Sequence, residues 1–236
     1  VALNFLMKQD QAFWLHPESW QLIREYVNDP TSTVFTYLLN HQQSFEHYFG
    51  DAAVKDKIYE TYLKWPARYV QYPANGRPWL DEKGFNAFLN QLQGSNYARK
   101  QEVAGLSRLT VYFGLHNWKS YALTVDDMLE HGLLSLAYPA SDKLYSYAEN
   151  IKRFGSDEPF VLKRAVDWAK MLTEKATGLD AGKKAAYLEL YASLLEASGN
   201  TTLANATRKK IDEQALKKEQ MAAPFQMLKP AGAKNK

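Results

Sequence analysis

Residues 184–211 read KAAYLELYASLLEASGNTTLANATRKKI, and this stretch decides the fold. Four residues share one helical face because they are spaced i, i+3, i+4 and i+7: Leu188, Tyr191, Ala192 and Leu195. Gly199 then ends the helix, since glycine readily adopts the left-handed conformation of a helix C-terminus. A second face follows with Leu203, Ala204, Thr207 and Ile211. The stretch therefore predicts a helical hairpin, with Ala192 and Ala204 at a close crossing.

The same pattern recurs along the rest of the chain. Ser32 is a suitable N-cap for a phenylalanine-rich helix that continues to Gly50, and Asp51 begins a partner helix. No stretch alternates with period two. The sequence predicts an all-α fold of stacked antiparallel helical hairpins, a TPR-like α–α superhelix without a significant sheet. We expect a helical repeat domain over residues 1–220, with a possible division into 1–80 and 81–220, and a mobile Ala/Lys/Pro tail at 221–236.

The composition narrows the class of protein. The chain has 236 residues, 46% hydrophobic and 23% charged, which is ordinary for a globular protein. No apolar run is long enough for a membrane span. Residues 1–205 hold 21 basic and 23 acidic side chains, whereas the remainder holds 8 and 3. The positive charge is confined to the C-terminal end, so the sequence predicts no nucleic-acid partner.

The chain has no cysteine. This excludes a thiol nucleophile, a CxxC redox pair, a thiolate zinc site and any disulfide within the chain. The sequence begins at Val1 without a charged and apolar leader. We therefore expect a fragment or a processed product whose targeting signal, if it had one, lay upstream.

The last hairpin resembles a tetratricopeptide repeat. When Gly199 is aligned with the turn glycine of that motif, five residues match: Leu188, Tyr191, Ala192, Leu195 and Ala204. Arg208 stands where the motif has an aromatic residue, and no proline closes the unit. The resemblance implies a degenerate repeat.

A second resemblance covers residues 16–63 and 185–200. The first segment, HPESWQLIREYVNDPTSTVFTYLLNHQQSFEHYFGDAAVKDKIYETYL, has a short helix, an Asp-Pro turn and a phenylalanine-rich helix ending in Tyr-Phe-Gly. It is similar to the helical region that follows the thioredoxin domain in bacterial envelope thioredoxin-family proteins. The resemblance implies a periplasmic or envelope location and a protein partner, or an upstream domain of the same polypeptide. The redox residues of that family cannot be assigned, because the chain has no cysteine.

Two histidine-containing segments are candidate metal sites. His41 and His47 are spaced i, i+6 and stand on different sides of a helix, whereas metal-binding pairs use i, i+4. Asp127 and His131 have the i, i+4 spacing, but no second helix offers a matching pair. Polar residues on a solvent-facing side, and a histidine at a helix C-terminus, explain both segments. The sequence predicts no metal and no cofactor.

The loop at residues 65–80, WPARYVQYPANGRPWL, is the candidate interaction site. Three prolines and one glycine prevent a continuous helix. Aromatic rings and guanidinium groups, the side chains enriched at protein–protein hot spots, gather in it: Trp65, Arg68, Tyr69, Tyr72, Arg77 and Trp79. The alternative interpretation is that these rings cover an apolar gap between two helical pairs.

Two functions remain open. The first is a non-enzymatic helical repeat module for protein–protein interaction. The second is a small-molecule or anion binder, or an enzyme, with a pocket between helical pairs in which Arg68, Arg77 and tyrosines hold an anion. Lysine pairs 209–210 and 217–218 are interrupted by acidic residues and predict a solvated helix face.

Overall fold

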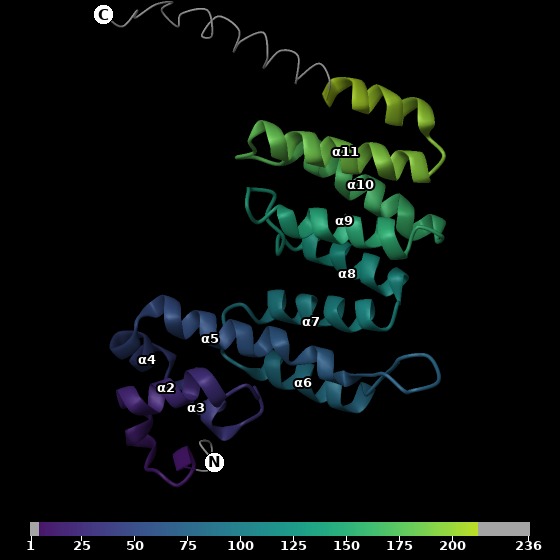
Figure 1. Cartoon of the computed structure of the whole chain (residues 1–236). Coiled ribbons are helices and arrows are strands. Elements are labelled where there is room, and N and C mark those ends of the chain that lie inside the picture. The colour runs from purple at the N-terminus through teal and green to yellow at the C-terminus, as the bar shows by residue number, and fades with distance from the viewer. Residues whose placement is uncertain (1–4, 212–236) are drawn as a thin grey trace, which may run out of the picture. The chain divides into compact units, whose positions relative to one another are not determined.

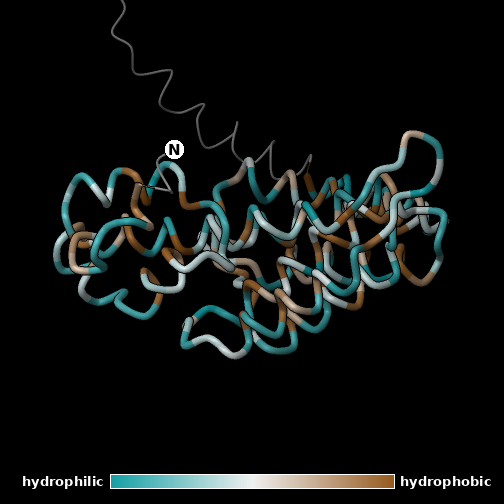
Figure 2. Tube along the Cα trace, turned by 90° about the horizontal axis from the view of Figure 1, so that it is seen from below, coloured by the Kyte–Doolittle hydropathy of each residue, from teal (hydrophilic) through white to brown (hydrophobic). Residues whose placement is uncertain are grey.

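The computed structural model describes residues 5–211 and is all-α, as the sequence predicts (Figure 1). Within those residues the only sheet has two antiparallel strands of two residues each, β1 (Val70–Gln71) and β2 (Trp79–Leu80). Figure 2 shows apolar positions recurring among polar ones along the helices, as amphipathic helices require.

The chain divides into two compact units between Leu133 and Leu134. The boundary considered from the sequence, between residues 80 and 81, lies inside the first unit. Helix α5 (Asp51–Lys64) packs on α7 (Lys100–Gly114), and the 3-10 helix η2 (Pro66–Tyr69) packs on α6 (Glu82–Gly94) and α7. These contacts join the two sides of residue 80 into one core.

The first unit also contains the remaining N-terminal elements and one further hairpin partner. They are η1 (Gln11–Leu15), α2 (Pro17–Tyr26), α3 (Thr33–Asn40), α4 (Gln42–Phe49) and α8 (Trp118–Glu130). The predicted N-cap is confirmed: Ser32 Oγ accepts from the Phe35 amide at 3.3 Å. Asp81 caps α6 in the same way, since its Oδ1 accepts from the Gly84 amide at 3.0 Å. Helix α5 begins at Asp51, as predicted.

The prediction of one helix from Ser32 to Gly50 is wrong, because the helix breaks at His41. The backbone there has φ −113° and ψ 26°, outside the helical range. The His41 ring stacks on Tyr37 with 3.9 Å between centroids, and its Nδ1 donates to the Tyr37 carbonyl at 3.0 Å. After the break, α4 packs two aromatic rings on Trp20. The Phe45 and Phe49 ring centroids lie 5.8 and 5.2 Å from the Trp20 ring centroid. Contacts between distant residues thus override a helical spacing that continues through the break.

The second unit begins with α9 (Asp142–Phe154), α10 (Pro159–Lys175) and α11 (Ala181–Ala197), followed by a helix over residues 201–211. Helix α10 packs on both α9 and α11. Gly199 has φ 84°, which is the left-handed conformation predicted for this turn. Ala192 and Ala204 are both fully buried, which a close crossing of their helices requires. The Ala/Lys/Pro tail lies outside the described residues.

The interior of the second unit contains a polar network around Tyr187, which is only 1% exposed. The Tyr187 hydroxyl donates its one proton to Asp142 Oδ1 at 3.0 Å. The Tyr187 oxygen therefore accepts the hydrogen bond from the Ser141 hydroxyl at 2.8 Å. Lys183 Nζ donates to Asp142 Oδ2 at 2.7 Å. The network joins the start of α9 to the first turns of α11 and satisfies the buried phenol.

Candidate functional site

The loop at residues 65–80 forms a hairpin that is anchored at its base. The Trp65 and Tyr69 rings are partly buried against the core of the first unit. Trp65 Nε1 donates to the Tyr69 hydroxyl at 2.8 Å, and the Arg68 guanidinium lies 3.7 Å from the Trp65 ring centroid. The Tyr69 ring also lies 5.7 Å from the Phe85 ring of α6. Trp65, Arg68 and Tyr69 therefore fix the position at which the hairpin extends from the helices.

Pairing of β1 with β2 holds the two sides of the hairpin together beyond Tyr69. Val70 pairs with Leu80, and Gln71 with Trp79. The Asp81 amide donates to the Tyr69 carbonyl at 2.8 Å, so the same Asp81 closes the hairpin and caps α6. Val70 is buried whereas Gln71 and Trp79 are exposed, as expected where only one face of a pair packs on a core.

Two glycines on the neighbouring helices make room for the hairpin. A Cβ on Gly84 would lie 2.9 Å from the Tyr69 ring and closer still to the Asp81 carboxylate. A Cβ on Gly114, the last residue of α7, would lie 2.8 Å from the Tyr72 hydroxyl and 3.2 Å from a Val70 methyl group. At distances below 3.0 Å a neighbouring atom must shift, so a side chain at Gly84 would displace the Tyr69 ring or the Asp81 cap. At Gly114 the Tyr72 hydroxyl is the end of an exposed side chain and could move at lower cost.

The tip of the hairpin is exposed. In Figure 1 the loop that follows α5 projects away from α5 and α6. The Tyr72 and Trp79 side chains are 68% and 56% exposed, among the most exposed large apolar residues of the described chain. Arg77 is also exposed and makes no hydrogen bond or ion pair with the described residues. The segment 65–80 contains no acidic residue, so its charge is positive.

The structure thus divides the six residues singled out from the sequence into two groups. Trp65, Arg68 and Tyr69 form the anchor, which agrees with the alternative interpretation that aromatic rings cover a gap. Tyr72, Arg77 and Trp79 are presented to solvent. Two of the four aromatic rings in the loop, those of Tyr72 and Trp79, are therefore exposed. Binding by these residues stays a prediction.

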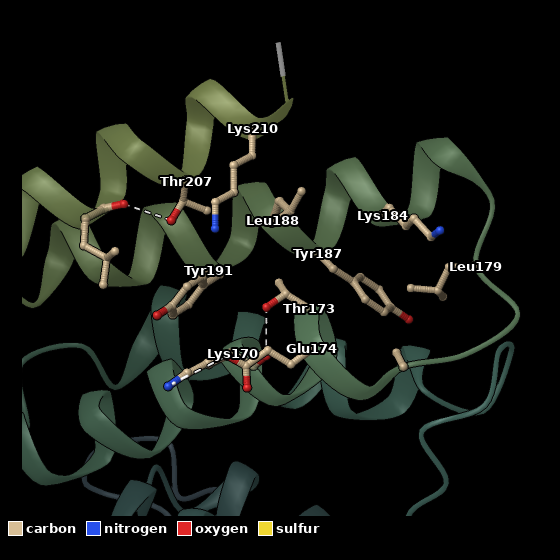
Figure 3. Close-up of a pocket in the computed structure, with 12 residues that line it drawn as sticks. Lys170, Thr173, Glu174, Leu179, Lys184, Tyr187, Leu188, Tyr191, Thr207 and Lys210 are labelled. Atoms are coloured by element: carbon tan, nitrogen blue, oxygen red, sulfur yellow. Dashed lines mark hydrogen bonds and ion pairs between the residues drawn. The ribbon is translucent and has the colours of Figure 1, made fainter. Parts of the chain in front are cut away.

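A cleft in the second unit is a different kind of site, and sequence reasoning missed it (Figure 3). It has a volume of about 480 Å³ and lies among α10, the loop before α11, α11 and the helix over 201–211. Its lining includes three lysines, one tyrosine and three leucines that carry the argument below: Lys170, Lys184, Lys210, Tyr191, Leu179, Leu188 and Leu203. Leu188 and Tyr191 were assigned from the sequence to helix packing, and Lys210 to a solvated face. No spacing rule would have brought these four segments together.

The segments considered for metal binding have other contacts. His131 Nδ1 lies 3.3 Å from Asp127 Oδ1 and 2.8 Å from the Asp127 carbonyl, at the C-terminus of α8. His41 closes α3, and the His47 ring lies against Tyr48 at 5.2 Å. Among residues 5–211, no group of three or more histidine, aspartate or glutamate side chains is arranged to hold a metal ion.

Burial sets the ionisation of several groups in the first unit. It raises the pKa of Tyr59, Tyr62 and Tyr97 to about 12. Burial also lowers the pKa of Lys57 to about 8, although its Nζ donates to the Arg24 carbonyl at 2.9 Å. At the hairpin base, burial raises the pKa of Tyr69.

No family model, curated protein or solved structure matches the chain. The resemblances to a tetratricopeptide repeat and to thioredoxin-associated helical regions therefore stay predictions. None of the described helices is both long and apolar enough to cross a bilayer.

Proposed function

We propose that the protein is a non-catalytic helical repeat module that binds another protein through the tip of the 65–80 hairpin. The observation that carries the proposal is the contrast within the hairpin. Its base is anchored by Trp65, Tyr69 and strand pairing, while Tyr72 and Trp79 remain largely exposed. A rigid support that presents aromatic side chains loses little conformational freedom on binding.

The chemistry of the tip defines the partner. Arg77 has no partner within the described residues, and no carboxylate occurs between residues 65 and 80. Tyr72 and Trp79 offer flat, exposed aromatic faces in the same hairpin as this cation. The proposed partner is an extended protein segment that carries a carboxylate close to a proline or an aromatic side chain.

The wider context belongs to the same proposal. We infer a stacked, TPR-like arrangement of the helical pairs and an accessory role in a thioredoxin-family protein of the bacterial cell envelope. Support comes from the resemblance of residues 16–63 and 185–200. The reading frame upstream of Val1 tests this part: a thioredoxin domain with a CxxC pair supports it, and another kind of domain there contradicts it.

Selection from a random peptide library tests the binding role. Peptides are selected on the wild-type chain and then measured by calorimetry against Arg77→Glu and Trp79→Ala. We expect selected peptides to carry Asp or Glu beside Pro or an aromatic residue, and each variant to weaken binding at least about tenfold, the loss typical of a hot-spot residue.

Tyr48→Ala is the matched control. Tyr48 lies on α4, is 64% exposed, and is not part of the hairpin. Peptides that bind the hairpin should bind this variant with wild-type affinity. Peptides that bind Arg77→Glu and Trp79→Ala as tightly as the wild type would contradict the proposal.

A further inference from the structure

We propose that the cleft in the second unit binds a small organic anion, a carboxylate carried on an apolar body. This site is independent of the hairpin, because every residue that lines it belongs to α10, α11, the loop between them or the helix over 201–211. Its volume of about 480 Å³ lies within the range of small-molecule sites.

The charges around the cleft favour an anion. Lys170, Lys184 and Lys210 line it together with one acidic residue, Glu174. Glu174 is already paired with Lys170, whose Nζ lies 3.8 Å from Glu174 Oε1. Among the described residues, no hydrogen bond or ion pair involves the Lys184 or the Lys210 ammonium group. Within residues 5–211, these two ammonium groups thus have no carboxylate partner that would compete with a bound anion.

Lys210 is the residue best placed to anchor the anion. Figure 3 shows its side chain extending from the last helix toward Thr207 and Leu188, with the ammonium directed to the cleft. The two threonine hydroxyls there already donate within their own helices: Thr207 to the Leu203 carbonyl and Thr173 to the Lys170 carbonyl, each at 2.8 Å. The donors that remain for a ligand are thus the lysines and the Tyr191 hydroxyl.

The rest of the lining is suited to an apolar body. Leu188 and Tyr191 from α11 form one wall, and Leu203, which is 42% exposed, faces the same cleft from the last helix. Leu179 contributes from the loop. A purely polar anion such as phosphate would leave these surfaces uncovered, and a neutral apolar molecule would leave the lysines unpaired. The lysines and the apolar lining together favour a ligand that has both an anionic group and an apolar part.

Calorimetry on the full chain tests the proposal with three probes: decanoate, decan-1-ol and inorganic phosphate. Decanoate has a carboxylate and an alkyl chain. Decan-1-ol has the alkyl chain without the charge, and phosphate has the charge without the alkyl chain. We expect decanoate to bind at one site, and the other two to bind at least about tenfold more weakly, because each loses one class of contact.

Two variants locate the site. Lys210→Gln should weaken decanoate binding about three- to tenfold and reduce the preference over decan-1-ol. Leu203→Glu places a carboxylate on the opposite wall and should abolish binding. Lys209→Gln is the matched control, since Lys209 is the exposed neighbour and does not line the cleft. Circular dichroism verifies that each variant keeps its helix content.

Three results would overturn the inference. Equal affinities for decanoate and decan-1-ol would show that the lysines do not select an anion. Equal losses for Lys210→Gln and Lys209→Gln would place the anion elsewhere. Absence of decanoate binding would remove the site itself. None of these results bears on the hairpin, which the peptide selection tests separately.

Discussion

Tyr72 in the hairpin and Tyr187 in the second unit are the same residue in opposite environments. Tyr72 is 68% exposed, and Tyr187 is 1% exposed. The Tyr187 hydroxyl is hydrogen-bonded to Ser141 and Asp142, and burial raises its pKa. Burial of a phenol without a hydrogen-bond partner costs free energy, and these two residues remove that cost for Tyr187. The comparison shows that this chain uses some aromatic residues to hold the fold together and leaves others at the surface.

The Tyr187 network includes an ion pair between Lys183 and Asp142, with 2.7 Å between Nζ and Oδ2. The hydrogen bond from Lys183 lowers the pKa of Asp142, and the same contact raises the pKa of Lys183. Both groups thus remain charged over a wide range of pH. Tyr72, in contrast, is 68% exposed, so water can solvate its hydroxyl.

The largest expected effect is at Tyr187. Tyr187→Ala should lower the free energy of unfolding by about 3–5 kcal/mol, because it leaves a cavity and removes a partner of Ser141 and Asp142. Tyr187→Phe keeps the ring and should cost about 1–2 kcal/mol. Urea denaturation followed by circular dichroism measures both. A loss below about 1 kcal/mol for Tyr187→Ala would break the comparison, since Tyr187 would then contribute no more than a surface residue.

The anchor of the hairpin should show the next largest effect. Gly84→Ala places a Cβ against Tyr69 and Asp81 and should destabilise the protein by about 1–3 kcal/mol. Gly94→Ala is the control in the same helix, because a Cβ at Gly94 meets no atom within 4 Å. That variant should be neutral or stabilising by up to about 1 kcal/mol. If the two changes had equal effects in urea denaturation, the hairpin would not depend on the close approach at Gly84.

Much of this fold could be predicted from the sequence because local signals agree with the contacts. Ser32 and Asp81 act as the caps that their positions indicate, and Gly199 ends α11 as expected. The break at His41 could not be predicted, since the apolar spacing continues through it and the cause is packing of Phe45 and Phe49 on Trp20. Local propensity is a weak guide where distant residues decide.

The two candidate sites also differ in how far the sequence could predict them. Residues 65–80 are contiguous, and prolines mark the loop, so the sequence singled out the hairpin. Its division into anchor and exposed tip depends on which rings pack on the helices, such as Tyr69 on Phe85, and the loop sequence does not reveal this. The cleft unites Lys170, Tyr191 and Lys210 from three helices, and nothing in their spacing indicates a shared site.

Alkaline pH distinguishes buried from exposed phenols. Tyr59, Tyr62 and Tyr97 have pKa values of about 12 in the folded protein, against 10.0 for the unperturbed group. Above about pH 10 the unfolded chain loses these protons while the folded chain keeps them. The free energy of unfolding should therefore decrease between about pH 10 and pH 12. Urea denaturation at a series of pH values measures this decrease.

Lys57 should make the free energy of unfolding increase with pH, in a pH range that begins below that of the three tyrosines. Its pKa of about 8 in the folded protein lies below the usual 10.5, so the unfolded chain binds more protons between these values, and stability rises with pH there. Lys57→Met removes this rise and should leave the decrease above pH 10. A decrease that begins below pH 8 in Lys57→Met would contradict the assignment to the three tyrosines.

The smallest expected effect is at the tip of the hairpin. Tyr72→Ala and Trp79→Ala should each change the free energy of unfolding by no more than about 0.5 kcal/mol, because most of each side chain is already in contact with water. Removal of a large aromatic side chain normally costs several kilocalories per mole when the ring packs in a core. A near-zero cost would mean that the fold does not require these rings, and that another role must explain their presence on an anchored support. A loss above about 2 kcal/mol for either variant would instead make the hairpin part of the core and remove the argument for a binding tip.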